Sequence, residues 1–364
     1  MNDIPTYNHS KPDLEPEFKP SFCHYAAKIS ILAPILSLIF LKSLAYGFAD
    51  VKPPWGVLIT VGLSFLLAFI FLVSLVLALI ALTGMPRYGK EGILGRALAG
   101  LLVSTVLLAF WGAGFVHGFK TALQNRQAAN AVTQAATEVH DNLKKELAEK
   151  GTIGPDSVRS RSEKMKSALD KASREMTGDV ALVAKAGSAY TAKMQSLLTD
   201  YTAALRAMKS PPVLEMKGVD QREQLEGKKE LVKKFMEANE KLMAFYTKAE
   251  SVFRDELVRA KVPVPTFEAA LKEYRQNEDE RNYLAVKIRM TDQRIGTALL
   301  GALDILDGSW GDWKYNPENK SLIFKDTTVI AKYNNYVGEM NSAAQEQAQL
   351  QGEYVKLPAT ASVQ

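Results

Sequence analysis

The sequence contains few of the residues that build reactive or metal-binding sites. It has one cysteine, Cys23, and four dispersed histidines, His9, His24, His117 and His140. No two histidines stand four residues apart, as they do in a zinc site on one helix. Neighbouring side chains such as Cys23 and His24 point in different directions on a helix, which favours a structural role for both. We therefore expect no metal and no cofactor, and the lone thiol does not identify the compartment.

Sequence motifs of catalysis are also missing. The chain has neither the Gly-x-Ser-x-Gly motif of hydrolases nor the glycine fingerprint of dinucleotide-binding folds. Carboxylates are abundant, but charged runs such as Glu278–Arg281 are typical of solvated helix faces. We expect that the protein is not an enzyme.

A strong basic excess is absent as well. The chain has 45 Lys and Arg against 40 Asp and Glu, and after residue 115 the balance is 37 to 34. A protein that neutralises phosphates needs a concentrated positive surface. This near balance argues against nucleic acid as a partner.

Long apolar runs are missing after residue 115, but three precede it. They cover residues 29–48, 55–83 and 93–115, and their only charges are Lys42 and Arg96. A hydrocarbon core of about 30 Å requires about 20 helical residues, and backbone amides in lipid must bond within a helix. The sequence predicts three transmembrane helices, with membrane lipids as a partner. A cleaved signal peptide is the alternative for the first run, although the acidic residues that precede it argue against this.

Lysine and arginine near the ends of the three runs predict the orientation. Six of them share a side with the N-terminus, namely Lys11, Lys19, Lys28, Arg87, Lys90 and Arg96, and four share a side with the C-terminal part, namely Lys42, Lys52, Lys120 and Arg126. Cytoplasmic loops carry more of these residues. We expect a multi-pass protein of the bacterial inner membrane, with a cytoplasmic N-terminus and a periplasmic or extracellular C-terminal domain.

The turn between the second and third runs imitates a phosphate-binding loop. Residues 84–91 read GMPRYGKE, but Glu91 stands where that motif has a magnesium-binding Ser or Thr. A carboxylate at this position opposes phosphate binding. We expect instead that Arg87, Lys90 and Arg96 contact anionic lipid headgroups.

The same stretch carries a resemblance to a known family. An apolar helix, the turn Gly-Met-Pro-Arg-Tyr-Gly-Lys-Glu-Gly and the segment Ile-Leu-Gly-Arg-Ala-Leu-Ala-Gly-Leu-Leu follow one another within residues 61–115. This arrangement resembles a widespread bacterial two-helix membrane domain of unknown function. The resemblance implies a bacterial membrane protein and no particular activity.

Small residues recur at helical spacing in the third run. The pairs are Gly95 with Ala99, Gly100 with Ser104, and Gly114 with Gly118. Such pairs let helix backbones approach closely in lipid. We expect them to pack the three spans together, and dimerisation is the alternative.

The third run is not followed by a helix-breaking sequence. Gly118 is the only glycine between residues 116 and 150, and apolar residues from Ala128 to Leu147 keep helical spacing. The sequence predicts one helix from residue 93 to 150, about 87 Å long at 1.5 Å per residue. Such a helix either transmits a shift from one end to the other or serves as a stalk.

Proline and glycine divide the remaining chain into further helices. We expect helices near residues 155–176, 179–208, 220–261, 266–306 and 327–351. Within the third of these, apolar residues follow two heptad registers and Asn239 takes a core position, as in coiled coils. The registers are Leu225, Val232, Tyr246 and Phe253, and Phe235, Leu242 and Ala249. The predicted fold is all-α, with a tail at 1–28, a membrane domain at 29–118, an extended helical bundle or coiled coil at 119–354 and a flexible tail at 355–364.

A short aromatic segment interrupts the helices near residues 310–325. Trp313 and Tyr315 alternate before the turn Asn316-Pro-Glu-Asn319, which predicts a β-hairpin. Trp310, Trp313 and Tyr315 could form a partner-binding surface, a carbohydrate-stacking surface or a cap on the bundle core. The cap is the commonest use of such a cluster.

These patterns narrow the function without naming a reaction. We expect a membrane-anchored bundle with a structural, scaffolding or assembly role at the bacterial envelope, with a protein partner or self-association. The alternatives are a signal-input subunit that acts through the long helix, and an accessory subunit of a transporter. Converging polar groups in a pocket of the bundle would favour the signal-input role, whereas a large exposed apolar patch would favour the scaffold. A small-molecule ligand is left open.

Overall fold

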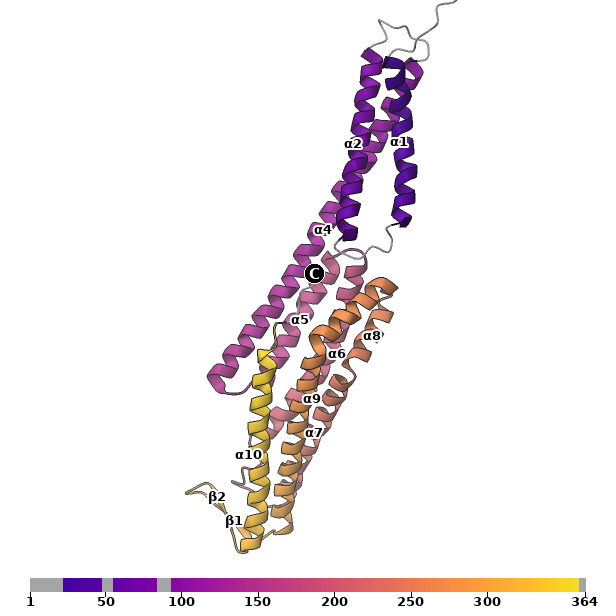
Figure 1. The fold of residues 1–364 in the computed structure, drawn as a ribbon. Coiled ribbons are helices and arrows are strands. Elements are labelled where there is room, and N and C mark those ends of the chain that lie inside the picture. The colour runs from indigo at the N-terminus through magenta and orange to yellow at the C-terminus, as the bar shows by residue number, and fades with distance from the viewer. Residues whose placement is uncertain (1–21, 48–54, 84–92, 360–364) are drawn as a thin grey trace, which may run out of the picture. The chain divides into compact units, whose positions relative to one another are not determined.

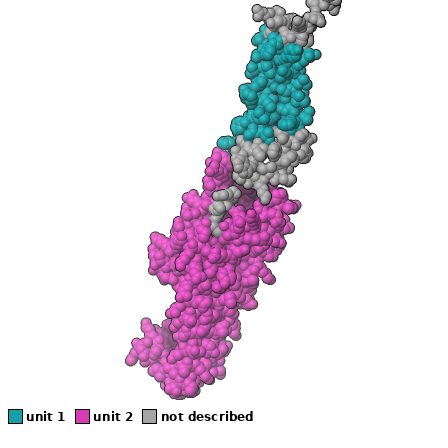
Figure 2. Space-filling view, viewed as in Figure 1, with its two compact units in different colours: residues 1–120 teal, residues 121–364 magenta. Residues whose placement is uncertain are grey.

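The computed structural model describes residues 22–47, 55–83 and 93–359 of the chain (Figure 1). These residues form nine helices and one antiparallel pair of strands, so the all-α prediction is confirmed. The predicted turn at 84–91, with Arg87 and Lys90, lies outside the described residues. The chain divides into two compact units, residues 1–120 (unit 1) and 121–364 (unit 2), which Figure 2 colours separately.

Unit 1 contains three apolar helices, as the sequence predicts. They are α1 (Phe22–Gly47), α2 (Trp55–Thr83) and the first part of α4 (Leu94–Lys150). Each is long and apolar enough to cross a membrane. The predicted continuation of the third run as one helix to residue 150 is confirmed, and α4 therefore has residues in both units.

Helix α1 begins at Phe22, seven residues before the first apolar run. Cys23, Ala26 and Ala27 of the extra turns are buried against Ala81 of α2 and Ile93. This contact with the other helices stabilises helical structure in a segment whose own hydropathy is low. Hydropathy along the chain does not record such contacts between helices.

Unit 2 is a bundle formed by the second part of α4 and six further helices. These are α5 (Pro155–Glu175), α6 (Asp179–Lys209), α7 (Arg222–Thr247), α8 (Ala249–Arg259), α9 (Val264–Gly308) and α10 (Thr327–Lys356). Helix α6 packs against α5, α7 and α8, and α9 packs against α7 and α10. Proline at the first turn of α5 and the Asp326 side chain at the start of α10, which accepts from Thr328 N–H, mark the helix starts.

The helix predicted at 220–261 is interrupted, and this boundary was not predicted. At Lys248 (φ −108°, ψ 15°) the chain leaves the helical conformation between α7 and α8. The Lys248 N–H is shared between the carbonyls of Ala244 and Phe245, and the Thr247 hydroxyl donates to the Met243 carbonyl at 2.9 Å. A threonine hydroxyl that bonds back to the preceding turn often bends helices, and the heptad pattern continues across this interruption.

The main core of unit 2 lies along α7 and α9. Most predicted heptad positions are buried there, including Leu225, Val232, Phe235 and Leu242, which are at most 1% exposed. Asn239 is also fully buried, and its amide donates to the Arg289 carbonyl at 2.8 Å. Since a buried amide needs a particular partner across the interface, this bond fixes how α7 lies against α9.

The predicted hairpin is confirmed. Strands β1 (Trp313–Asn316) and β2 (Ser321–Phe324) pair antiparallel, with Trp313 opposite Phe324 and Tyr315 opposite Leu322. These four side chains share one face of the hairpin and pack on the main core.

Candidate functional site

One of the three predicted small-residue pairs lies at a helix interface. Gly100 and Ser104 of α4 are buried, and a Cβ atom at Gly100 would overlap the Ser30 side chain of α1. Glycine at this position therefore allows α1 and α4 to approach closely. The other four residues, Gly95, Ala99, Gly114 and Gly118, are exposed within unit 1.

The predicted headgroup contact Arg96 is exposed near the start of α4, and its role stays a prediction. An aromatic row follows further along the same helix. Trp111 stacks on Phe115 (ring centroids 5.1 Å apart), Phe115 stacks on Phe119 (6.3 Å), and Phe65 of α2 meets Phe115 edge-on (5.8 Å). Aromatic side chains commonly concentrate where a transmembrane helix reaches the headgroup region.

The structure separates the three aromatic residues of the hairpin segment. Trp313 is buried among Leu303 and Leu306, and its indole N–H donates to the Leu306 carbonyl at 2.8 Å. Trp310, whose ring meets that of Trp313 edge-on, and Tyr315 are only partly buried. The position of Trp313 is that of a cap on the bundle core, which leaves Trp310 and Tyr315 as the residues that a partner could reach.

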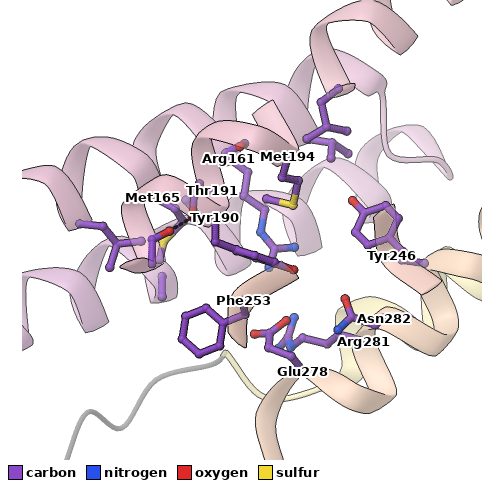
Figure 3. Close-up of a pocket in the computed structure, with 18 of the residues that line it drawn as sticks. Arg161, Met165, Tyr190, Thr191, Met194, Tyr246, Phe253, Glu278, Arg281 and Asn282 are labelled. Carbon is purple, nitrogen blue, oxygen red and sulfur yellow. Dashed lines mark hydrogen bonds between the residues drawn. The ribbon is translucent and has the colours of Figure 1, made fainter. Parts of the chain in front are cut away.

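Unit 2 contains a polar cavity that the sequence analysis did not predict. We call the polar cavity the space of about 220 Å³ that is lined by side chains from α4 to α10 (Figure 3). Its charged side chains are Arg161 of α5, and Glu278 and Arg281 of α9. Figure 3 shows Arg161 extending from its helix toward Glu278 and Arg281, which project from the facing helix.

The two arginines of the polar cavity are held by the end of α10. Arg161 Nη1 donates to the Tyr354 hydroxyl at 2.7 Å, and both guanidinium carbons lie about 5.5 Å from the centroid of the Tyr354 ring. Arg281 is 2% exposed and donates to the carbonyl of Pro358, just beyond α10. Burial works against the charge of Arg161, yet Tyr354 and Glu278 hold the pKa of its guanidinium above the ordinary value. Because the guanidinium group of arginine stays protonated in proteins, the bundle encloses two positive charges.

Two buried polar atoms in the polar cavity lack a partner among the described residues. They are Nε2 of His140, a residue that is 7% exposed, and Oγ of Ser162, a residue that is 1% exposed. A buried polar atom without a hydrogen bond costs about 1–3 kcal/mol. Burial lowers the pKa of His140, and the positive charges of Lys144, Arg281 and Arg161 lower it further, so its imidazole is neutral at pH 7.

Aromatic side chains form another wall of the polar cavity. Phe253 of α8 stacks on Tyr274 of α9 (centroids 4.8 Å apart), and Tyr190 of α6 meets both rings edge-on. The hydroxyls of Tyr190 and Tyr274 lie 3.1 Å apart, and the Asn282 amide donates to Tyr274 at 3.0 Å. Burial raises the pKa of Tyr274 to about 12, so its phenol is neutral and offers hydrogen bonds without charge.

A second, larger space adjoins the polar cavity. We call it the apolar cavity: its volume is about 780 Å³, and most of its lining is leucine, isoleucine, valine, methionine and other apolar side chains from α4, α5, α6, α7, α9 and α10 and the segments that connect them. Six residues line both cavities, namely Val158, Arg161, Leu198, Tyr246, Ala285 and Tyr354. The two spaces are therefore neighbours inside the same bundle.

Two of the charged groups of the apolar cavity, Arg289 and Asp292, form a buried network; the other two are Arg161, which lines both cavities, and the exposed Lys209. Arg289 and Asp292 form an ion pair at 3.1 Å, and Asp292 also accepts from the Tyr201 hydroxyl at 2.9 Å and the Gln347 amide at 2.6 Å. The guanidinium carbon of Arg289 lies 4.4 Å from the centroid of the Tyr201 ring. The members of this network are partners of one another, whereas the polar cavity contains buried polar atoms without a partner.

The interpretation of Glu278–Arg281 as a solvated helix face is wrong for Arg281, which is buried. The spacing of the sequence indicates that Arg281 is buried, because it lies on the apolar stripe of α9. The residues of this stripe follow one another at steps of seven and four: Tyr274, Arg281, Ile288 and Asp292. A charge on such a stripe signals a buried site. The partners of that charge come from α5 and α10 and could not be paired with it from spacing alone.

Among the residues that the structure describes, no three His, Cys, Asp or Glu side chains lie together in a group that could hold a metal ion. No protein-family model, curated protein or solved structure matches the chain. The geometry of the two cavities therefore carries the functional argument.

Proposed function

We propose that this protein is a membrane-anchored signal-input subunit whose helical bundle binds a small molecule. One observation carries the proposal: His140 and Ser162 present unpartnered, buried polar atoms to a cavity that also holds two charged arginines. Buried polar atoms are normally hydrogen-bonded, and exceptions in a pocket mark binding sites. A polar group of a bound molecule would supply the missing partners.

The distribution of exposed apolar side chains also favours the signal-input role over the scaffold role. The exposed large apolar residues described in unit 2 are spread over α4, α6, α8, α9 and β2: Leu123, Val180, Val258, Val264, Tyr283, Met290 and Ile323. Protein-binding surfaces usually gather such side chains into one patch. The scaffold role is our second candidate, supported by Ile323, which is exposed on the opposite face of the hairpin from Tyr315. Co-purification of a protein that is lost in Ile323→Asp would favour it.

Helix α4 provides a route for a signal. It contributes His140 to the polar cavity and Gly100 to the interface with α1, and it is a single helix from Leu94 to Lys150. A bound molecule that favours one arrangement of α4 in the bundle could shift the helix as a body. Amide hydrogen exchange along α4, with and without the bound molecule, tests this route: unchanged exchange in residues 121–150 would contradict it.

The membrane and the orientation are part of the proposal. Three apolar helices, and six against four basic residues at their ends, support a bacterial inner-membrane protein with its bundle outside the cytoplasm. Reporter fusions after Gln364 and in the turn at 86–91 test the orientation. A cytoplasmic signal from the C-terminal fusion would overturn it.

The binding role is tested with the full chain purified in mild detergent. Solvent extraction followed by mass spectrometry should release one small molecule in near-equal amount to the protein. We expect this molecule to be lost in Arg281→Gln and retained in Arg275→Gln, whose arginine lies on the same helix but is exposed and paired with Glu250. Equal amounts in both variants, or none in the wild type, would contradict the proposal.

A further inference from the structure

The polar and apolar cavities differ in the charges and hydrogen-bonding atoms that their side chains leave without a partner. In the polar cavity, two guanidiniums face one carboxylate, that of Glu278, so the cationic side chains exceed the anionic ones by one. The unpartnered His140 Nε2 and Ser162 Oγ lie in the same lining. An anionic group with several oxygen atoms could accept hydrogen bonds from the guanidiniums, the hydroxyl and the imidazole together.

The apolar cavity also has cationic side chains, but one of them, Lys209, is exposed and another, Arg161, is shared with the polar cavity. No residue of its lining has a buried side-chain atom without a partner among the described residues. Its ion pair between Arg289 and Asp292 is completed by Tyr201 and Gln347, and the Gln351 side chain accepts from the Ile153 N–H at 2.9 Å. The surface that remains is mainly aliphatic. Apolar cavities of this kind take up apolar molecules rather than water, and 780 Å³ lies within the range of about 300–1,000 Å³ that small-molecule sites occupy.

The two cavities meet at Arg161, Tyr246 and Tyr354, which line both. We infer that together they form one site for a single-chain amphiphile, with its anionic carboxylate or phosphate headgroup in the polar cavity and its alkyl chain in the apolar cavity. This inference rests on the proposed binding function and names the class of ligand. Arg161, at the junction, contacts the headgroup, and the aliphatic lining beyond it surrounds the chain.

The ligand class is tested with the full chain in nanodiscs of zwitterionic lipid, by native mass spectrometry with empty nanodiscs subtracted. The probes are hexadecanoate, hexadecyl phosphate, hexadecanol, hexadecyltrimethylammonium, acetate and inorganic phosphate. We expect the two anionic amphiphiles to bind about tenfold or more tightly than the neutral and cationic chains, because charge-assisted hydrogen bonds are lost without the anion. Acetate and inorganic phosphate should bind at least as weakly as hexadecanol.

Two variants separate a headgroup contact from general loss of structure. Arg161→Gln should weaken binding of hexadecanoate by about tenfold or more, whereas Arg159→Gln should not, because this partly exposed arginine of the same helix pairs with Glu163 and lines neither cavity. Ser162→Ala should weaken binding without lowering the stability of the ligand-free protein, because its hydroxyl has no partner there. A variant that only unfolded the bundle would lose stability as well.

The outcomes distinguish this inference from the proposed function. Hexadecanol binding as tightly as hexadecanoate would overturn the anionic headgroup, and inorganic phosphate binding as tightly as hexadecyl phosphate would overturn the alkyl chain. Failure of every probe, while another molecule co-purifies with the wild type and not with Arg281→Gln, would overturn the amphiphile and leave the binding function standing. Failure of every probe with no co-purifying molecule would overturn both.

Discussion

Units 1 and 2 bury different kinds of residue. In unit 1 most of the fully buried positions are small: Ala27, Ala78, Ala81, Ala97 and Ser30 have no measurable exposure, with Ile93 as a large exception, while Phe40, Phe69 and Leu102 are more than 60% exposed. In unit 2 most of the fully buried positions are large, such as Leu225, Leu242, Leu303 and Leu306. Water drives large apolar side chains inward, whereas lipid does not, so helices in lipid pack through small residues.

The buried polar groups differ in the same way. In unit 1, Ser30 and Ser74 donate to carbonyls of their own helices, and Ser104 is an unpartnered exception beside Gly100. In unit 2, some buried polar groups, such as Thr291, also donate within their own helix, but others connect different helices, as Asp292 does with Tyr201 and Gln347. Five buried side-chain atoms of unit 2 lack a partner among the described residues, and they belong to His140, Ser162, Thr202, Asn239 and Gln293. Of these five residues, His140 and Ser162 line the polar cavity, and this position distinguishes them from the other three.

Asp292→Ala should have the largest effect, because it breaks the self-satisfied network of unit 2. Removing one member of a buried ion pair leaves Arg289 uncompensated and costs about 3–5 kcal/mol of unfolding free energy. Urea unfolding followed by the fluorescence of Trp310 and Trp313 measures this loss. Asp279→Ala, at an exposed position on the same helix, is the control and should change little. Equal losses of unfolding free energy in the two variants would show that the buried network of Asp292 does not stabilise unit 2 more than an exposed carboxylate does.

Gly100→Leu tests the small-residue packing of unit 1. A larger side chain would overlap Ser30 of α1, and overpacking of this kind costs about 1–3 kcal/mol. The fluorescence of Trp111 during unfolding in sodium dodecyl sulfate reports the change. Gly114→Leu on the same helix has open space around it and should unfold like the wild type. A tolerant Gly100→Leu would mean that close approach is not required in this unit.

The sequence predicts much of the fold because helices and hairpins leave local periodicity. Leu225, Val232 and Leu242 are buried as their heptad spacing requires, and the proline boundaries agree with the helix ends to within a few residues. The break at Lys248 was missed because the apolar pattern continues across it. The site was missed for a different reason: Arg161 and Arg281 are brought together only by the packing of α5, α9 and α10. Among the residues predicted to act, Gly100 lies at an interface and Trp313 lies in the core.

Ser162→Ala should raise the free energy of unfolding, whereas the two preceding substitutions should lower it. The hydroxyl is 1% exposed and unpartnered, so removing it relieves a desolvation cost of about 1–3 kcal/mol in the ligand-free protein. We expect a gain of about 1 kcal/mol in the free energy of unfolding, since the methyl group fills slightly less space. Urea unfolding of delipidated protein checks this, with the exposed Ser160→Ala as control. A loss of stability would show that the hydroxyl has a structural partner.

The smallest expected effect is the pH dependence that His140 contributes. Burial and nearby positive charges lower the pKa of His140 below its ordinary value of 6.5 in the folded protein. As the pH falls below 6.5, the unfolded chain therefore binds a proton that the ligand-free folded protein does not, and stability decreases. His140→Gln should make the difference in unfolding free energy between pH 7.5 and pH 5.5 smaller than in the wild type. His117→Gln, at an exposed position in unit 1, should leave this difference unchanged.

An anion bound beside the imidazole of His140 favours its protonated form, so the bound amphiphile should reduce the pH dependence of wild-type stability or reverse it. The same pH dependence with and without hexadecanoate would place the headgroup away from His140, and would break the assignment of the polar cavity as its site.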